Sequence, residues 1–566
     1  MEVRHYKDTE IFPIIDRAII DYIANSVLGD LESYEEYLNL IDLRRTKHFY
    51  KKYESIYNVL YYAIQIVRFK NQYTHGIPKD NALNMFKDYY TSYYQMDSYY
   101  RKFYLAYDTS KKYEFINKLQ EKIEYIYTNW YLGGLSAHWS QAVRENLANN
   151  WKISGIKKQQ DFYRTNVLER LKNGERIFVI ISDAMRYEIG VSLSERIEQE
   201  TLGEIKIEPM LGVVPSITKL GMAALLPHQT LTIDDTGYVM IDGQRIEGYI
   251  ARKNYIQSKV DDSIVVKHDD FSNMNLTNKR ELFKGKKLIY IYHDKLDSIG
   301  DNSPSENQIF KAAEDTLDDL MNTINSIRNE LSGTNIFITA DHGFLYQRNP
   351  LVESDKIASG LDKPIESKKR YTLSRKRQDV DGQIHLGLSE ILSIESDLNV
   401  YVPNGAIRNR IQGPGSNFVH GGASLQEIVV PLIFYKNKRP HQKNVTQFEK
   451  VKVEYTSQTK RITNKLFSLR FFQNERVMDK RIPVTVEVYF EDYKGNIISN
   501  VETIIADKST NNPSEREFIM NFALETMQFD KSKNYYLIIK DIETDQITSK
   551  IPFEISLGIS TDFDFF

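Results

Sequence analysis

Apolar residues recur at three- and four-residue intervals through the first part of the chain. The spacing is clear in residues 14–23 and 115–126, and it is typical of amphipathic helices that bury one face. A tyrosine-rich run at residues 89–104 continues the pattern, so we expect its rings to pack between helices. Gly133-Gly134 predicts a break. Residues 1–172 are therefore predicted to form a helical domain.

From Arg176 onward, short unbroken apolar runs alternate with helical stretches. Three runs stand out: residues 177–181, 288–292 and 336–339. Runs of this length suit parallel strands that helices bury on both faces. A helical stretch at about residues 306–331 supplies a crossover between the second and third. We expect residues 173–445 to form an α/β domain with a mostly parallel sheet and helices on both faces.

Alternating and apolar runs separated by turns follow from about Val451. Residues 484–490 alternate, residues 535–539 are apolar, and Lys494-Gly495-Asn496 lies between them as a turn signal. This texture favours antiparallel strands, so residues 446–566 are predicted to form a β-sandwich of immunoglobulin-like size.

The composition narrows the class of protein. Hydrophobic residues make up 41% and charged residues 27%, and the net charge of −3 gives no general attraction to nucleic acid or an anionic membrane. The absence of cysteine excludes disulfides, thiolate ligands and cysteine nucleophiles, and it fits a reducing cytoplasm. We see neither a signal peptide in the first 30 residues nor an apolar run of membrane-spanning length. We therefore expect a cytoplasmic protein without membrane contact.

Polar residues follow all three predicted strands of the α/β region. Asp183, His293 and the pair Asp341-His342 come at or just after the strand ends. Because ligands of open α/β sheets bind beyond the carboxyl ends of the strands, we expect these side chains to gather there. Carboxylates and imidazoles suit Zn²⁺ or Mn²⁺, and a two-metal phosphoryl-transfer site needs several. The candidate ligands are Asp183, His293, Asp297, Asp341, His342 and His420.

Five segments carry a resemblance to a known family. They are Ser182-Asp183-Ala184-Met185-Arg186-Tyr187-Glu188 and residues 215–227, 292–301, 339–343 and 420–427. In this order they resemble the motifs of PglZ proteins, which belong to the phage growth limitation and bacteriophage exclusion (BREX) systems and share the alkaline phosphatase core. The resemblance covers about residues 176–435. It implies a metal-dependent phosphatase or phosphodiesterase that acts with other phage-defence proteins.

The resemblance also implies which residues would bind two divalent ions, with zinc preferred and manganese as the alternative. The first ion would be held by Asp183, Asp341 and His342, and the second by His293, Asp297 and His420. The superfamily usually has an Asp-x-x-x-His order at the second ion. Here the order runs from His293 to Asp297, which makes that pair the weakest part of the assignment.

A threonine is the nucleophile that the resemblance implies. Phosphatases and sulfatases of the superfamily place it several residues before a small-small-Leu-Leu segment, and Thr218 stands seven residues before Leu225. At a helix N-terminus its neighbourhood would favour phosphate, and its attack would give a covalent phospho-enzyme. Ser216 is the alternative, although a serine after proline is also a natural N-cap.

Two further residues have a functional and a structural interpretation. Arg186 could clamp a phosphate oxygen of the substrate, or it could pair with Glu188 or Glu195. Asp301 could orient His293 from behind, or it could cap the loop that follows.

Three functions remain open. The first is hydrolysis of a phosphate ester or nucleotide, and the second is phosphate or nucleotide binding by a catalytically inactive scaffold in a defence complex. The third is a metal-dependent nuclease, for which the near-neutral charge provides no evident phosphate-backbone track. Retention of a nucleophile and six candidate ligands favours the first.

Overall fold

The structure, a computed structural model, describes residues 6–557 except 8, 10, 30–32, 111–112, 359, 412–416, 439–447, 458, 479 and 531. The chain divides into two compact units. The larger comprises residues 1–44, 49–197 and 203–438, and the smaller comprises residues 45–48, 198–202 and 439–566. The predicted domain boundaries near residues 172 and 445 stay predictions.

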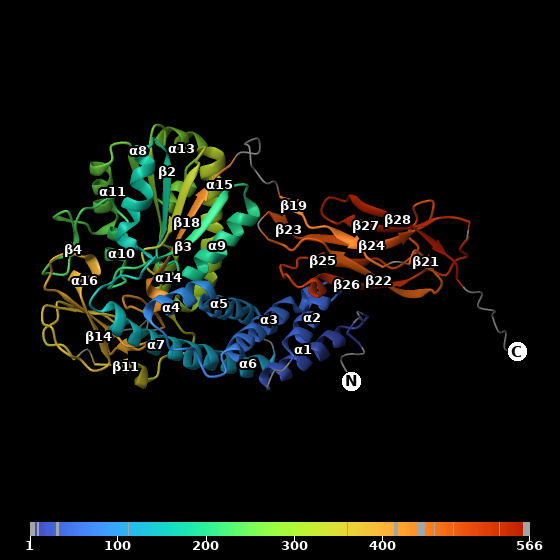
Figure 1. The fold of residues 1–566 in the computed structure, drawn as a ribbon, viewed down its shortest axis with the longest axis horizontal. Helices are drawn as coiled ribbons and strands as arrows, with labels where there is room; N and C mark the ends of the chain where they lie inside the picture. Colours follow the sequence, from blue (N-terminus) through green and yellow to red (C-terminus); the bar gives the residue numbers. More distant parts are fainter. Residues whose placement is uncertain are drawn as a thin grey trace. The chain divides into compact units, whose positions relative to one another are not determined.

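Helices fill the first part of the larger unit, as the apolar spacing predicts (Figure 1). They include α1 (Pro13–Leu28), α2 (Tyr34–Arg44), α3 (Tyr50–Gln72), α4 (Ala82–Asp88), α5 (Tyr94–Thr109), α6 (Glu114–Tyr125) and α7 (Gly134–Ala142). The predicted break at Gly133-Gly134 is wrong, because a π-helical segment, Ile126–Gly133, runs directly into α7 with both glycines in helical geometry. No helix in the described part of the chain is long and apolar enough to cross a membrane.

The tyrosines of this region pack inside it, which confirms the structural interpretation of the tyrosine-rich run. Tyr89, Tyr100 and Tyr127 are fully or almost fully buried, and the rings of Tyr100 and Tyr127 stack with centroids 3.6 Å apart. Their hydroxyls donate to buried carboxylates: Tyr89 and Tyr127 to Asp97, and Tyr100 to Glu124. These rings are core, with their polar ends satisfied.

A seven-stranded sheet forms the centre of the α/β region, in the order β1-β3-β18-β9-β2-β8-β7. The strands are β1 (Lys157–Lys158), β2 (Ile177–Ser182), β3 (Glu204–Leu211), β7 (Ser263–Lys267), β8 (Leu288–His293), β9 (Asn335–Thr339) and β18 (Val429–Lys436). β2 pairs in parallel with β8 and β9, and β7 pairs in parallel with β8. Only β18 among them runs antiparallel to its neighbours. The mostly parallel sheet is confirmed.

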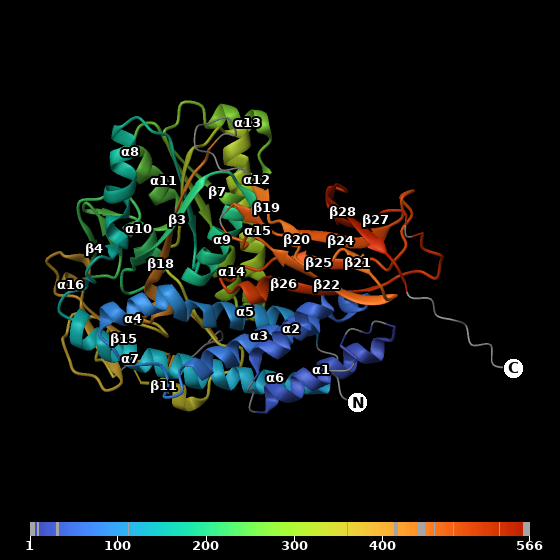
Figure 2. The same cartoon turned by 45° about the vertical axis from the view of Figure 1, so that its right-hand side comes forward.

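Helices cover both faces of this sheet (Figures 1 and 2). On one side lie α10 (Thr218–Ala224) and α11 (Gly248–Lys259), and on the other α9 (Tyr187–Glu200) and α15 (Ile309–Glu330). Alternate side chains of β8 point to opposite faces. The Tyr290 hydroxyl therefore reaches the Leu225 carbonyl directly after α10, whereas His293 contacts Asp319 of α15.

Small sheets that the sequence did not predict interrupt the α/β region. Three short strands, β4 (Leu231–Ile233), β5 (Val239–Ile241) and β6 (Gln244–Arg245), follow α10. Four strands, β12 (Glu366–Ser367), β13 (Thr372–Ser374), β15 (Asn399–Pro403) and β14 (Gln383–Gly387), make another sheet in that order. Strands of two to five residues are too short to leave a clear hydrophobic period.

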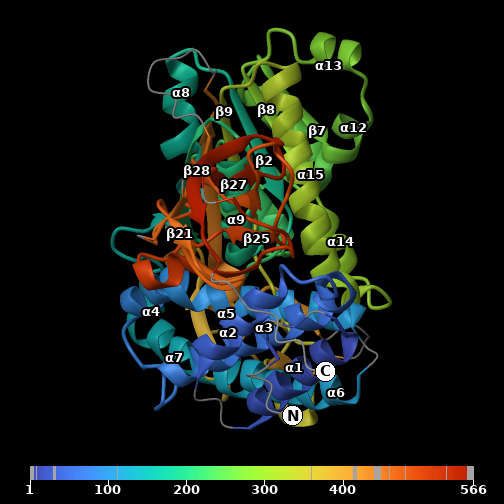
Figure 3. The ribbon, with the colours of Figure 1, turned by 90° about the vertical axis from the view of Figure 1, so that its right-hand side faces the viewer.

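The smaller unit is built from β-strands around its own core (Figures 1 and 3). It has two main sheets. The first contains the three strands β20 (Val453–Tyr455), β22 (Leu466–Gln473) and β26 (Glu517–Ala523). The second contains, in this order, the five strands β21 (Arg461–Ile462), β28 (Ile547–Ile555), β27 (Tyr535–Asp541), β24 (Val484–Glu491) and β25 (Glu502–Ala506). Phe522 of the first sheet meets Phe490 of the second with ring centroids 5.4 Å apart. The inner side chains of the two sheets thus share one core, as expected for a sandwich.

Candidate metal centre

Two neighbouring parallel strands deliver the first group of candidate ligands. Asp183 follows β2, and Asp341 and His342 follow β9, whose Thr339 pairs with Ile181. Because the two parallel strands end at the same edge of the sheet, the side chains that follow them meet there. The His342 Nε2 atom lies 3.6 Å from Asp183 Oδ1 and 3.4 Å from Asp341 Oδ2. The ligand atoms of these three buried residues all lie within 4.8 Å of one another.

A second group lies beside the first. Asp297 belongs to α14 (Lys295–Gly300), and His420 follows the short strand β17 (Phe418–Val419). The His420 Nε2 atom lies 3.7 Å from Asp297 Oδ1, and the rings of His420 and His342 stack with centroids 4.1 Å apart. Asp297, His342 and His420 offer ligand atoms within 4.8 Å of one another. The stacked histidines join the two groups into one centre.

Backbone carbonyls orient both histidines. His342 Nδ1 lies 3.0 Å from the Gly343 carbonyl oxygen, and His420 Nδ1 lies 3.1 Å from the Ser216 carbonyl oxygen. If each Nδ1 carries the proton and donates it there, each Nε2 lone pair faces the carboxylates. This is the arrangement that metal-binding histidines commonly have. A histidine with one such nitrogen binds one ion, and the short distances to Asp183 and Asp341 assign His342 to the first group.

The centre brings three buried carboxylates close together, those of Asp183, Asp297 and Asp341. Burial raises the pKa of Asp183 well above its usual range, and Asp341 and Asp297 raise it further. Burial also raises the pKa of Asp341 to about 6, whereas burial and the nearby His420 lower the pKa of His342 to about 3. Burial alone would lower the pKa of His420, but Asp301 and Asp297 raise it to about 9. Such a cluster of buried acids and imidazoles favours a bound cation.

The residues present fit divalent ions. Asp183 Oδ1, Asp297 Oδ1 and Asp341 Oδ2 are buried and have no hydrogen-bond partner among the described residues. An unpaired carboxylate oxygen is costly to bury unless it is neutralised or coordinates a metal. Carboxylate oxygen and imidazole nitrogen together form a donor set that zinc and manganese both accept.

The two candidate nucleophiles have different surroundings. The Thr218 hydroxyl lies at the first residue of α10, 3.1 Å from His342 Nε2, so it faces the centre. The Ser216 hydroxyl donates to the Gly422 carbonyl oxygen at 2.7 Å and accepts from the Gly421 N–H at 3.1 Å. Ser216 is therefore engaged in fixing the loop that carries His420. The geometry favours Thr218 over Ser216 as the reacting residue.

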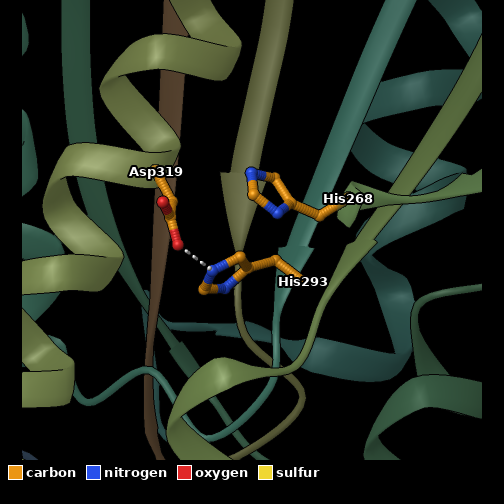
Figure 4. A group of neighbouring side chains, drawn as sticks. All are labelled: His268, His293 and Asp319. Carbon is orange, nitrogen blue, oxygen red and sulfur yellow. Dashed lines mark hydrogen bonds and ion pairs between the residues drawn. The ribbon is translucent and has the colours of Figure 1, made fainter. Parts of the chain in front are cut away.

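The structure does not bring His293 together with Asp297 and His420. Its Nε2 atom lies 3.4 Å from Asp319 Oδ2, its Nδ1 lies 3.0 Å from the Ser182 hydroxyl, and its ring meets His268 edge-on (Figure 4). The reason is strand alternation: His293 is the last residue of β8 and points to the α15 face, as does its partner Ser182.

His268, His293 and Asp319 also offer ligand atoms within 4.8 Å of one another. This group already has protein partners, however. The Lys295 ammonium pairs with Asp319, and the Ser272 hydroxyl lies 3.1 Å from His268 Nε2. Among the described residues, this group has no buried carboxylate oxygen without a hydrogen-bond partner, unlike the main centre. We therefore interpret it as a hydrogen-bonded cluster.

Asp301 is a residue of the centre that the sequence analysis placed only in a supporting role. Its Oδ1 atom lies 3.8 Å from His420 Nε2. Asp297 and Asp301 stand four residues apart, at the start and just after the end of α14, so their side chains project to the same side. The i, i+4 spacing of the two carboxylates was the available signal. Asp301, and not His293, therefore lies beside His420.

Arg186 is paired away from the centre. Its guanidinium is 1% exposed, forms a 2.6 Å ion pair with Asp97 of α5 and lies over the Phe344 ring. The predicted partners Glu188 and Glu195 are not the ones it meets: Glu188 instead pairs with Arg101 of α5. The ion pair links α5 to the loop after β2 and favours the structural interpretation of Arg186, although its Nε and Nη2 atoms have no well-aligned hydrogen bond among the described residues.

Glu427 holds the loop that follows His420. Its carboxylate accepts the Gly422 and Ser424 N–H groups and pairs with Arg370 at 2.8 Å. The Glu427 and Ser424 side chains also form a capping box at α17 (Leu425–Ile428). These contacts hold the loop between His420 and α17, and Glu427 is not part of the ligand groups.

Comparison with known proteins gives one family. Residues 162–435 match the family model described as the BREX system PglZ alkaline phosphatase-like domain. The chain is 37% identical over 566 residues to the alkaline phosphatase-like protein PglZ of Bacillus cereus (strain H3081.97), covering all of this chain and 66% of that protein. It is 28% identical over 569 residues to the alkaline phosphatase-like protein BrxZ of Escherichia coli O9:H4 (strain HS), covering 97% and 64%. The chain thus spans about two thirds of the length of these relatives.

Among solved structures, two ectonucleotide pyrophosphatase/phosphodiesterase 5 enzymes are similar in fold. The murine protein is 13% identical and the match covers 47% of this chain and 88% of that one, with a TM-score of 0.33. The human protein is 12% identical and the match covers 46% and 88%, with a TM-score of 0.34. Similarity at this level does not align the sites residue by residue.

Proposed function

The chain belongs to the PglZ family of alkaline phosphatase-like proteins, and on this premise we propose that it is a metal-dependent phosphohydrolase or phosphodiesterase of a BREX-type defence system. The observation that carries the proposal is the Thr218 hydroxyl, 3.1 Å from His342 Nε2 within two joined groups of buried metal-type ligands. Other proteins of the defence system are the proposed partners. A phosphate ester or nucleotide is the proposed substrate.

The proposed centre takes two divalent ions, with zinc preferred. Asp183, Asp341 and His342 would hold one, and Asp297, Asp301 and His420 the other. Such ions would supply positive charge for the phosphoryl oxygens and lower the pKa of a bound hydroxyl or water. His342 and His420 would offer their Nε2 lone pairs to the ions, because each Nδ1 atom faces a backbone carbonyl to which it can donate its proton.

Thr218 is the proposed nucleophile. Its Oγ1 forms a bond to phosphorus, its proton passes to solvent, and the ester P–O bond breaks as the leaving oxygen takes a proton. Water then forms a new P–O bond, and the bond from phosphorus to Thr218 breaks, which restores the hydroxyl. Gly221 allows this placement of α10, since a Cβ there would lie 2.2 Å from the Asp341 carbonyl oxygen.

Hydrolysis of a chromogenic phosphodiester and the matching monoester tests the proposal. Each is assayed with Zn²⁺, Mn²⁺ or chelator, using wild type, Thr218→Ser and Thr218→Ala at equal metal content. We expect metal-dependent turnover that Thr218→Ser retains in part and Thr218→Ala loses by at least about a hundredfold. Folded, metal-loaded protein without turnover of either ester would instead support a phosphate-binding scaffold. Full turnover by Thr218→Ala would exclude Thr218 as the nucleophile.

A further inference from the structure

Tyr292 and Arg252 lie on the face of the sheet that carries Thr218. Tyr292 is the penultimate residue of β8 and pairs with Ile181, two residues before Asp183. It shares its face with Tyr290, whose hydroxyl reaches the carbonyl after α10. The guanidinium carbon of Arg252, on α11, lies 5.1 Å from the centre of the Tyr292 ring. The pair therefore stands at the strand ends where the candidate ligands gather.

Both side chains carry a buried polar atom that lacks a partner among the described residues. Tyr292 is 7% exposed, and neither its hydroxyl nor the Nε–H of Arg252 has a well-aligned hydrogen-bond partner among the described residues, although the Arg252 side chain lies close enough to the hydroxyl to lower its pKa. Buried hydroxyl and guanidinium groups are almost always paired in folded proteins. Two such donors side by side, next to three orphaned carboxylate oxygens, indicate that a ligand satisfies them.

The electrostatics connect this pair to the metal-type ligands. Burial raises the pKa of Tyr292 to about 12, with Arg252 opposing the rise and Asp341 adding to it. Tyr292 is thus a hydrogen-bond donor at neutral pH, beside a fixed positive charge.

We propose that Arg252 and Tyr292 bind the non-bridging oxygens of the phosphoryl group that the centre acts on. This rests on the proposed phosphoesterase function and deepens it by naming a protein-based phosphate site beside the ions. A guanidinium offers planar N–H donors that match phosphate, and the phenol adds a third donor. The Tyr292 ring holds the guanidinium in place by a cation–π contact. Arg252 and Tyr292 take the role that the sequence analysis considered for Arg186.

Binding of inorganic phosphate, measured by calorimetry on the zinc-loaded full chain, tests the proposal without requiring turnover. Arg252→Met is expected to weaken phosphate binding at least about tenfold, and Arg252→Lys less, because a lysine keeps the charge but not the planar donors. Tyr292→Phe keeps the ring and removes only the hydroxyl, and it is expected to weaken binding several-fold. Lys253→Met, a cation removed at the next position of α11, is the matched control and should bind as wild type.

Zinc content and melting temperature are measured on every variant. Weaker phosphate binding by Arg252→Met and Tyr292→Phe, at unchanged zinc content and stability, supports the site. Wild-type phosphate affinity in both variants, an equal loss in Lys253→Met, or no phosphate binding by zinc-loaded wild type overturns it. If phosphate binding depends on Arg252 but the protein has no esterase activity, the proposed catalysis is refuted and this phosphate site is supported. If esterase activity depends on Thr218 but phosphate binding does not depend on Arg252, the proposed catalysis is supported and this phosphate site is refuted.

Discussion

At the scale of single residues, the site is organised by what each side chain is already bonded to. The Ser216 hydroxyl is hydrogen-bonded to Gly421 and Gly422, and the Arg186 guanidinium forms an ion pair with Asp97. Thr218 and the orphaned oxygens of Asp183, Asp297 and Asp341 are the groups that still face the centre. The sequence predicted these four residues but could not show which neighbours would form hydrogen bonds or ion pairs with Ser216 and Arg186.

Replacing Asp301 with asparagine tests whether it belongs to the centre. We expect Asp301→Asn to weaken binding of one of two ions by at least about tenfold, since it removes a carboxylate beside His420. Metal content measured by mass spectrometry after dialysis checks this. Asp294→Asn, at an exposed position before α14, is the control and should retain both ions. Equal metal content in both variants would return Asp301 to the role of a loop residue.

Arg186→Met is predicted to be a stability variant. It leaves the buried Asp97 carboxylate without its 2.6 Å partner, which costs about 3–5 kcal/mol of unfolding free energy. Urea denaturation measures the loss. Lys311→Met removes one partner of an exposed ion pair with Asp315 and should change stability by less than about 1 kcal/mol. An Arg186→Met protein as stable as wild type, but weaker in phosphate binding, would restore the clamp interpretation.

At the scale of elements, the sheet was predictable and the direction of its side chains was not. Runs such as residues 177–181 are apolar throughout because helices cover both faces, so the pattern reveals a strand but no alternation. His293 and Tyr292 could therefore not be assigned to faces until the pairing with β2 was known. The short strands β12 to β15 were missed because each is only a few residues long, and the partner of Arg186 lies on a helix distant in sequence.

Close packing of α10 against the loop after β9 sets the position of Thr218. A methyl group at Gly221 would meet the Asp341 carbonyl oxygen at 2.2 Å, so Gly221→Ala must displace one of the two segments. We expect a loss of about 1–3 kcal/mol of stability together with reduced esterase turnover. Gly134→Ala has open space in a helical conformation and should be neutral or stabilising by up to about 1 kcal/mol. Full activity and stability in Gly221→Ala would show that α10 is not held this way.

At the scale of the whole molecule, the three hydrophobic patterns of the sequence correspond to three kinds of structure: helices, then an α/β region with its sheet, and then a region of β-strands. The family comparison agrees with the middle region, and the ligand groups all lie within the larger unit. Burying carboxylate oxygens without hydrogen-bond partners is costly, so the proposed metal binding should stabilise this unit.

Metal removal should therefore lower the melting temperature. Zinc in hundredfold excess over its dissociation constant would stabilise the folded chain by about 2.7 kcal/mol per site. Differential scanning calorimetry with zinc and with chelator measures the difference, and the Asp183→Asn, Asp341→Asn double variant, which removes two ligands of one site, should show about half of it. A transition that zinc does not shift in wild type would argue against metal sites in the folded chain.

The most direct test of the metal centre is a crystal structure of zinc-loaded protein with anomalous difference maps collected on both sides of the zinc edge. The account predicts two peaks, one among Asp183, Asp341 and His342 and one among Asp297, Asp301 and His420. Peaks at neither position, or zinc bound by His293 with His268 and Asp319 instead, would contradict it.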